Sequence, residues 1–177
     1  MRLDDQATRR CSLWSMPEGA DADRLQELRD RLAATANGLD FPVHCTVYGH
    51  IALDPDEAAR RIDVGVREMV PHTLRLVATG LENELFRALY LRVEPTVAVL
   101  SAHRAAAVAL GLPEYPAYFP HVSLLYSSSP AAERRQLVST LGLELPLTLQ
   151  VNTVALFTTE GDDPSSWNEL RRWSLGH

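Results

Sequence analysis

The sequence predicts an α+β fold with antiparallel sheets, organised as one internally duplicated domain over residues 1–177. Two stretches, 41–48 and 119–126, repeat one design, in which Phe-Pro opens an apolar run that carries His-x-Thr or His-x-Ser. Strand patterns alternate with helix patterns and include one clear hairpin, which favours antiparallel sheets over a doubly wound parallel fold. Because no Ser/Gly-rich linker divides the chain, we expect two pseudo-symmetric lobes packed together in a single domain.

The first strand and helix precede the first motif. Residues 11–16 alternate enough for a short strand. Asp21 or Asp23 can cap the helix that follows, whose leucines share one face, and Gly38 lies just past its end. The first motif is then predicted to lie on a strand at 43–49.

A second helix and a hairpin come next. Asp54 supplies an N-cap, with proline at the first helical position and glutamate at the third, so we predict a helix that keeps Met69 on its inner face. Residues 73–79 and 85–93 carry alternating patterns on either side of a turn that contains Gly and Asn. This arrangement indicates a hairpin.

The second motif lies in a similar context. Pro95 is predicted to start a helix, and the second motif strand is expected at 122–126. A Ser-Pro pair at Ser129 then opens another helix, which matches the helix after the first motif. Residues 145–157 alternate as a long strand, and the tail at 167–175 returns as either an edge strand or a short helix.

The charged residues exclude several kinds of function. The chain contains no lysine, which rules out a P-loop lysine, a Schiff base and a lysine-adenylate. The net charge of -6 argues against a broad electrostatic grip on long nucleic acid, because such binding relies on a basic surface. A small phosphorylated ligand held by local donors is compatible with both observations.

The sequence also bears on the cellular location of the protein. No apolar run is long enough for a membrane span, and residues 1–6 lack the apolar segment of a secretory signal, so we expect a cytoplasmic protein. Cys11 and Cys45 lack metal-binding spacing and are predicted to be buried thiols.

The two motifs carry groups suited to acid/base chemistry. Side chains alternate faces along a strand, so His44 and Thr46 point the same way, as do His121 and Ser123. One imidazole can take a proton from water while the other gives one to a departing oxygen, and the hydroxyls can donate to phosphate oxygens. The sequence therefore predicts that both motifs meet at a central cleft where a phosphodiester is hydrolysed.

The two motifs, His-Cys-Thr-Val and His-Val-Ser-Leu, resemble the double H-x-[T/S]-x signature of the 2H phosphoesterase superfamily. Ser-Leu-Trp near the start, the run at 120–126 and the Thr-Thr-Glu-Gly…Trp region are similar to the cyclic phosphodiesterase branch of plants and yeast. The resemblance implies a bilobal fold in which each lobe is an antiparallel sheet with outer helices, around a water-filled cleft.

The resemblance also implies an activity and a set of site residues. The expected reaction opens a nucleoside 2',3'-cyclic phosphate or the 1'',2''-cyclic phosphate of ADP-ribose, without metal or cofactor. His44 and His121 match the catalytic positions, and Thr46, Ser123 and Tyr126 match positions that hold the substrate phosphate. The family suggests His121 as the base and His44 as the acid, although the pseudo-symmetry leaves the reverse open. We expect a monomer that binds a small cyclic-phosphate nucleotide, with no membrane and no extended nucleic acid as partners.

Two other functions stay open on sequence grounds. One is an RNA-end processing enzyme of the same superfamily, either 2'-5' RNA ligase-like or a 3'-end phosphodiesterase, and the other is a non-catalytic nucleotide-binding module. A metal site is not predicted, because no carboxylate stands beside either motif. A rim role for His50 is left open, and Arg87 is predicted to be an exposed sheet arginine. Three tryptophans are predicted to be core or lobe-interface aromatics: Trp14, Trp167 and Trp173. Three other histidines are predicted to be peripheral: His72, His103 and His177.

Overall fold

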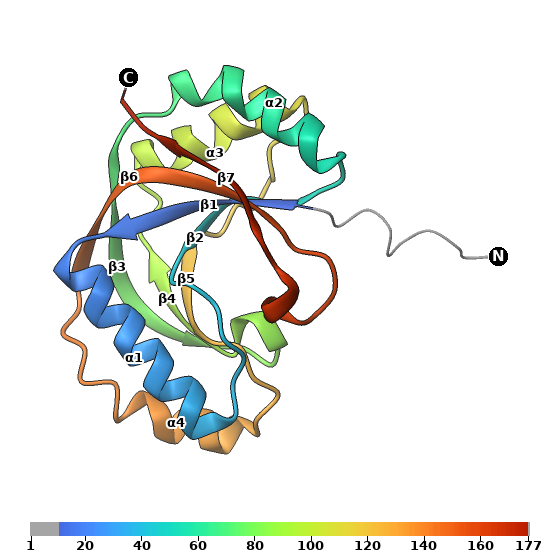
Figure 1. Cartoon of the computed structure of the whole chain (residues 1–177). Helices are drawn as coiled ribbons and strands as arrows, with labels where there is room; N and C mark the ends of the chain where they lie inside the picture. Colours follow the sequence, from blue (N-terminus) through green and yellow to red (C-terminus); the bar gives the residue numbers. More distant parts are fainter. Residues whose placement is uncertain (1–10, 177) are drawn as a thin grey trace.

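The structure, a computed structural model, describes residues 11–176 (Figure 1). The expectations for residues 1–6 and His177 lie outside this range. The strands are β1 (Cys11–Glu18), β2 (Cys45–Ile51), β3 (His72–Leu81), β4 (Leu89–Val93), β5 (His121–Leu125), β6 (Leu147–Thr158) and β7 (Glu169–Ser174). The helices are α1 (Ala20–Ala36), α2 (Pro55–Gly65), α3 (Val97–Leu110) and α4 (Ala131–Val138), with short 3-10 turns at Val66–Glu68, Leu85–Arg87 and Pro164–Ser166.

All seven strands form one antiparallel sheet in the order β1-β2-β5-β4-β3-β6-β7. Strand β1 also pairs with β6, so six strands close into a ring and β7 lies outside it against β6. The α+β prediction is therefore confirmed, whereas the prediction of two separate sheets is wrong. The physical reason is the length of β6, which pairs with β3 through Leu147 to Val151 and with β1 through Gln150 to Thr158.

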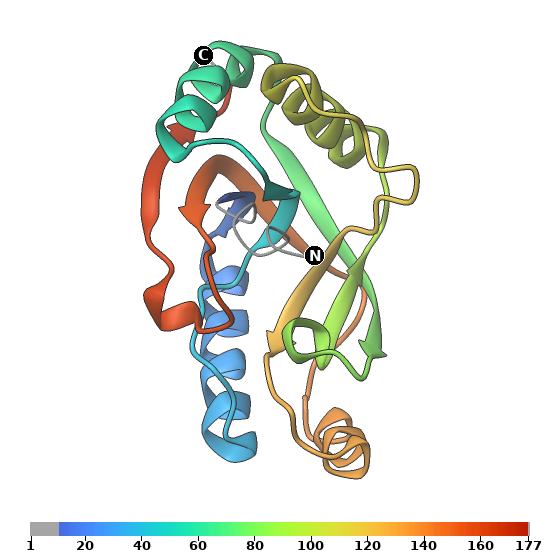
Figure 2. The same cartoon turned by 90° about the vertical axis from the view of Figure 1, so that its right-hand side faces the viewer.

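The two motif strands are neighbours in this ring. Strands β2 and β5 run antiparallel and meet where Cys45 pairs with Val122. This adjacency is what a duplicated domain would produce, but the duplication and the two lobes stay predictions. The helices lie in two groups (Figures 1 and 2), with α2 and α3 at one end of the molecule and α1 and α4 at the other.

Side-chain alternation separates the core from the face that carries the motifs. Cys45, Val47, Val122 and Leu124 are buried in the main apolar cluster. The alternate residues of both strands therefore point to the opposite face. Both cysteines are buried, as predicted, and burial raises the pKa of the Cys45 thiol to about 12.

Helix α2 begins as predicted but ends earlier. The Asp54 side chain accepts hydrogen bonds from the backbone N–H groups of Asp56 (3.0 Å) and Glu57 (3.3 Å). The predicted continuation to Met69 is wrong, because a 3-10 turn follows Gly65 and Met69 is extended. Gly65 packs against α3 so closely that a Cβ added there would lie 2.1 Å from the Ala109 Cβ.

Other boundaries also differ from the predictions. Helix α1 is capped by Gly19, and the aspartates expected as caps instead lie in its first turn, where they favour the helix dipole. Helix α3 is capped by Thr96 and begins two residues after Pro95. The hairpin is confirmed as β3 and β4, but the first residues of the predicted second strand form a 3-10 turn. The C-terminal tail is an edge strand, β7.

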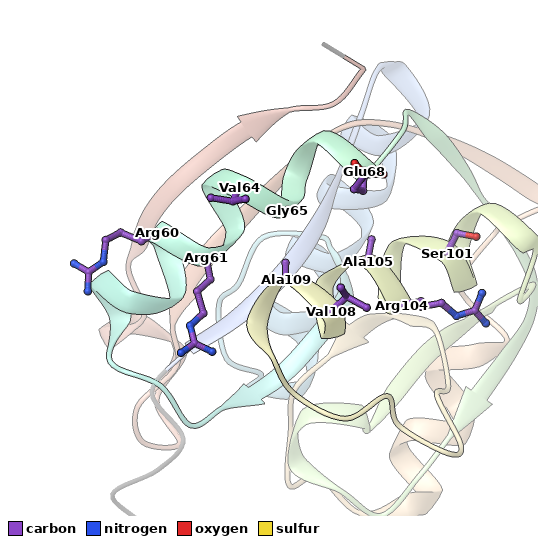
Figure 3. A pocket seen from close by; sticks show the side chains of 10 residues that line it. All are labelled: Arg60, Arg61, Val64, Gly65, Glu68, Ser101, Arg104, Ala105, Val108 and Ala109. Carbon is purple, nitrogen blue, oxygen red and sulfur yellow. The ribbon is translucent and has the colours of Figure 1, made fainter.

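A groove of about 760 Å³ lies between α2 and α3 (Figure 3). Its walls include Arg60, Arg61 and Arg104, and the exposed Val64 and Val108 lie beside them. None of the predicted site residues lines this groove. Within residues 11–176, no helix is both long enough and apolar enough to cross a membrane.

Candidate functional site

His44 lies immediately before β2 and is enclosed by aromatic rings. The residue is only 5% exposed. The imidazole stacks on the Trp14 indole, with ring centroids 3.7 Å apart and an angle of 12° between planes. The Phe41 ring approaches edge-on at 6.2 Å. His44 is therefore held in one orientation by packing on both sides.

Hydrogen bonding also defines the tautomer of His44. Its Nδ1 lies 2.7 Å from the carbonyl oxygen of Pro42. A carbonyl can only accept, so Nδ1 carries the proton and Nε2 of the neutral ring is the basic nitrogen. The imidazole is thus prepared to accept a proton through Nε2.

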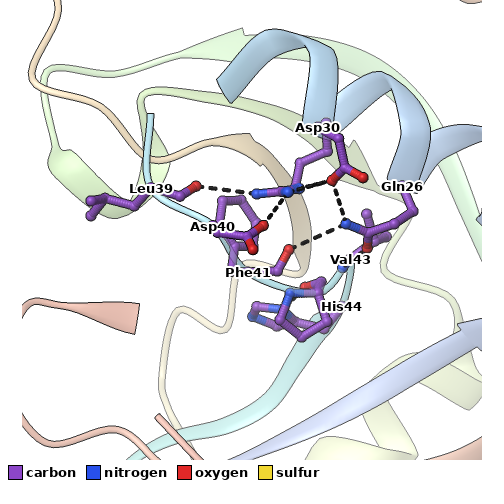
Figure 4. A network of polar contacts seen from close by, with 9 residues as sticks. Gln26, Asp30, Leu39, Asp40, Phe41, Val43 and His44 are labelled. Atoms are coloured by element: carbon purple, nitrogen blue, oxygen red, sulfur yellow. Dashed lines mark hydrogen bonds and ion pairs between the residues drawn. The ribbon is translucent and has the colours of Figure 1, made fainter. Parts of the chain in front are cut away.

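The loop before His44 is anchored to α1 (Figure 4). Arg29 of α1 is 2% exposed, donates to the Leu39 carbonyl oxygen (3.1 Å) and forms ion pairs with Asp30 and Asp40. Gln26, one helical turn earlier, also bonds to the loop. These contacts fix the course of the chain that delivers His44.

His121 is the first residue of β5 and has a matching hydrogen bond. Its Nδ1 lies 2.9 Å from the carbonyl oxygen of Phe119, again two residues earlier, so the neutral ring is basic at Nε2. The Phe119 ring stacks at 5.7 Å, and Tyr90 approaches edge-on at 5.6 Å. His121 is less buried than His44.

The environment lowers the pKa of both imidazoles. Burial lowers the pKa of His44 from 6.5 to about 4, against the opposing effect of the Pro42 carbonyl, and the charge of His121 lowers it further. Burial also lowers the pKa of His121, with a smaller contribution in the same direction from Arg87. An effect of His121 on His44 is consistent with their places in the sheet, because they flank the paired residues Cys45 and Val122 on neighbouring strands.

The two hydroxyls differ in their surroundings. Thr46 is partly exposed and pairs with Trp14 across β1 and β2. Ser123 is 4% exposed, and its hydroxyl donates to the carbonyl oxygen of Phe86 at 3.0 Å. The prediction that both hydroxyls face a hydrated cleft is therefore wrong for Ser123, because the 3-10 turn that carries Phe86 covers it.

Tyr126 belongs to an aromatic cluster next to the motifs. It is 4% exposed and stacks on Phe41 with ring centroids 3.6 Å apart. Burial raises the pKa of Tyr126, against a smaller lowering by a hydrogen bond from Ser123. The phenol thus lies beside the second motif hydroxyl and stays protonated at neutral pH.

The prediction that Arg87 is an exposed arginine on a strand is wrong. It lies on the 3-10 turn before β4 and pairs with Glu82 (2.5 Å) and Glu84 (3.2 Å). Glu82 also accepts a hydrogen bond from the Tyr90 hydroxyl at 3.0 Å. Since Arg87 acts on the pKa of His121, a polar network surrounds the second imidazole that strand periodicity did not indicate.

Two other histidines have structural partners. His72 and His103 are buried, at 7% and 3% exposed, so the prediction that they are peripheral is wrong. His103 Nδ1 lies 2.8 Å from the Val47 carbonyl oxygen, and its Nε2 accepts from the Tyr115 N–H at 3.1 Å. His103 therefore connects α3, β2 and the loop before the second motif. Among residues 11–176, no group of three His, Cys, Asp or Glu side chains is arranged to hold a metal ion.

Solved structures share this fold. The chain is similar to E. coli LigT in complex with 3'-AMP, with a TM-score of 0.64 and 16% identity over 96% of this chain and 99% of that one. It is similar to TT0787 of Thermus thermophilus, with a TM-score of 0.63 and 16% identity over 94% and 97%. A third structure, described as a phosphoesterase, has a TM-score of 0.63 and 15% identity over 96% and 99%. No curated protein matches the sequence closely enough to count as a relative.

The chain therefore has the same fold as LigT and as the structure described as a phosphoesterase. The family model described as the 2'-5' RNA ligase superfamily matches residues 17–163, which includes both motifs. The chain therefore belongs to the 2'-5' RNA ligase superfamily, a group of 2H phosphoesterases.

Proposed function

We propose that the protein hydrolyses a cyclic phosphodiester, either a nucleoside 2',3'-cyclic phosphate or the 1'',2''-cyclic phosphate of ADP-ribose, with His44 and His121 as acid and base. The observation that carries the proposal is the matched pair of imidazoles. Each is held through Nδ1 by the carbonyl oxygen two residues earlier, at 2.7 and 2.9 Å. His44 lies immediately before β2 and His121 begins β5, which are adjacent antiparallel strands. Both therefore offer Nε2 for proton transfer.

The difference in pKa favours one assignment of roles. A pKa of about 4 keeps His44 neutral at pH 7, as a base must be. His121 is less buried, so it is the imidazole more readily protonated. We therefore assign His44 as the base that activates water and His121 as the acid that protonates the leaving oxygen, the reverse of the roles suggested by family resemblance.

The remaining site residues would bind the phosphate. Thr46 is partly exposed and can donate to a non-bridging oxygen. Ser123 and Tyr126 can do so only after their present surroundings open, because both are nearly fully buried. LigT in complex with 3'-AMP shows that a protein of this fold holds a 3'-phosphorylated nucleotide, which supports a nucleotide substrate.

The second candidate is an RNA-end processing enzyme, which the family model favours by its description. Purified protein should be incubated, with EDTA present, with a panel of cyclic phosphates and with linear 2'-5' and 3'-5' dinucleotides. Turnover of the cyclic phosphates alone supports the proposal. Turnover of linear dinucleotides alone favours the second candidate, activity that requires an added divalent ion contradicts the two-histidine mechanism, and binding without turnover indicates a nucleotide-binding module.

Replacing the motif hydroxyls should separate catalysis from stability. Thr46→Ala is expected to lower turnover by about a hundredfold or more, since it removes a donor to the phosphate, without changing the melting temperature. Ser123→Ala should lower turnover and also cost about 1 kcal/mol of stability, because the Phe86 carbonyl oxygen loses its donor. Thermal melts and steady-state kinetics on both variants test this. A Thr46→Ala protein that melts early but keeps its turnover would show that the hydroxyl is structural.

The pH dependence should be bell-shaped with an acidic optimum. The value of kcat/KM reports the free enzyme, which requires a neutral His44 and a protonated His121. The rate should therefore rise as pH passes about 4 and fall above the pKa of His121, which burial holds below 6.5. The two limbs belong to the interacting pair. A rate that stays constant from about pH 6 to pH 9, measured with a cyclic phosphate, would contradict this arrangement.

A further inference from the structure

Gln26 of α1 bonds to the backbone on both sides of Pro42. Its Nε2 donates to the Phe41 carbonyl oxygen at 3.4 Å, and its Oε1 accepts from the Val43 N–H at 2.7 Å. Figure 4 shows Gln26 reaching from the helix toward the loop that ends at His44. The side chain therefore bridges the peptide units that flank Pro42.

The orientation of the Gln26 amide is determined by two independent partners. The Asp30 carboxylate, which is paired with Arg29, can only accept, so the amide nitrogen must face it, at 2.9 Å. The Val43 N–H can only donate, so the amide oxygen must face Val43. Both requirements are met by the same orientation, which leaves the amide a single arrangement.

The bond to Val43 acts directly on the group that holds His44. The Val43 N–H and the Pro42 carbonyl belong to one peptide unit, which is planar. Gln26 holds the N–H side of this plane, and the His44 Nδ1 donates to its carbonyl side at 2.7 Å. Hydrogen bonds in such a chain strengthen one another, because each polarises the next.

The second motif lacks an equivalent bond. His121 donates to the Phe119 carbonyl, whose peptide unit continues into Pro120. Proline has no N–H, so no side chain can hold that plane from its other edge. The difference singles out the first motif as the one held by a helix side chain.

We propose that Gln26 is a positioning residue for His44: through the peptide unit between Pro42 and Val43, it keeps the Nδ1–H tautomer and leaves Nε2 basic. It touches neither substrate nor the reacting atoms. The proposal rests on the proposed function only for its effect on rate, because the tautomer of His44 can be measured in the free protein.

The test uses Gln26→Met, which keeps the length of the side chain but removes its hydrogen bonds. Ring ¹⁵N chemical shifts of His44 above about pH 6 should show one tautomer, protonated at Nδ1, in the unmodified protein. Gln26→Met should show a mixture of tautomers. With an active substrate, Gln26→Met should lower kcat by about ten- to a hundredfold with little change in KM, since the base is misplaced.

Two control variants separate positioning from general stability. Glu27→Ala alters an exposed neighbour on α1, and Thr96→Ala removes the distant cap of α3, which accepts from the Val99 N–H. Both should keep the single tautomer. A single Nδ1–H tautomer in Gln26→Met, or loss of the single tautomer in either control variant, would overturn the proposal. If the unmodified protein hydrolyses no substrate, the proposed function fails, and the ¹⁵N measurement still decides the role of Gln26.

Discussion

His44→Asn and His121→Asn are each expected to lower turnover of a cyclic phosphate by about a hundredfold to ten-thousandfold, because each removes one of the two proton transfers. The double variant should be little slower than the slower single variant, since residues that act as a unit are not additive. Steady-state kinetics on the three proteins, with melting curves to confirm folding, test this. Full activity in both single variants would refute the two-histidine mechanism.

A substrate with an activated leaving group tells the two histidines apart. Such a leaving group hardly needs protonation, so a variant without the general acid should recover much of its rate, and a variant without the base should stay slow. On the pKa argument, His121→Asn should be rescued and His44→Asn should not. Rescue of His44→Asn instead would restore the roles that family resemblance suggests.

Trp14→Ala is expected to reduce stability by about 3–5 kcal/mol, because it opens a cavity beneath His44 and Phe157. For a domain of this size the melting temperature should fall by about 6–20 °C. The variant should also raise the pKa of His44 toward 6.5, since burial is the main cause of its lowering. Differential scanning calorimetry and the pH profile of kcat/KM measure the two effects.

Trp14→Phe is the matched control, because it keeps an aromatic ring under the imidazole. It should retain most of the stability and a low pKa at His44. If Trp14→Ala keeps the full melting temperature, or changes it without moving the pH profile, Trp14 does not provide the apolar surroundings of His44.

Local sequence signals predicted the elements well where one residue determines the local conformation. Asp54 caps α2 as its spacing indicated, and Cys45 is buried in the core as predicted. The end of α2 could not be predicted in this way. It depends on the close contact of Gly65 with Ala109 on α3, which only the packed molecule contains.

The motif histidines of the candidate site could be predicted from the sequence, but the residues that surround them could not. The repeated motifs indicated His44 and His121, and the structure places these next to the paired residues Cys45 and Val122. The stacking of Trp14 on His44 depends on the register between β1 and β2. The hydrogen bond between Gln26 and Val43 joins two residues that are 17 positions apart along the chain. Neither follows from periodicity, because both are set by tertiary contacts.

The same limit applies to the sheet. Two similar halves suggested two sheets, and each half does contain a motif strand. The sequence held no sign that one strand would serve both, since the alternation of β6 looks the same beside β3 as beside β1. The closure of the ring is therefore a property of the assembled fold.

The stack of Trp14 on His44 should also make the fluorescence of Trp14 sensitive to the protonation of His44. An imidazolium in contact with indole quenches its fluorescence more strongly than neutral imidazole does, and these two ring centroids are 3.7 Å apart. Emission from Trp14 should therefore dim as His44 gains a proton. A bound phosphate, which favours the charged imidazole, should move that dimming to higher pH, so the unlabelled protein carries its own optical signal of ligand entry.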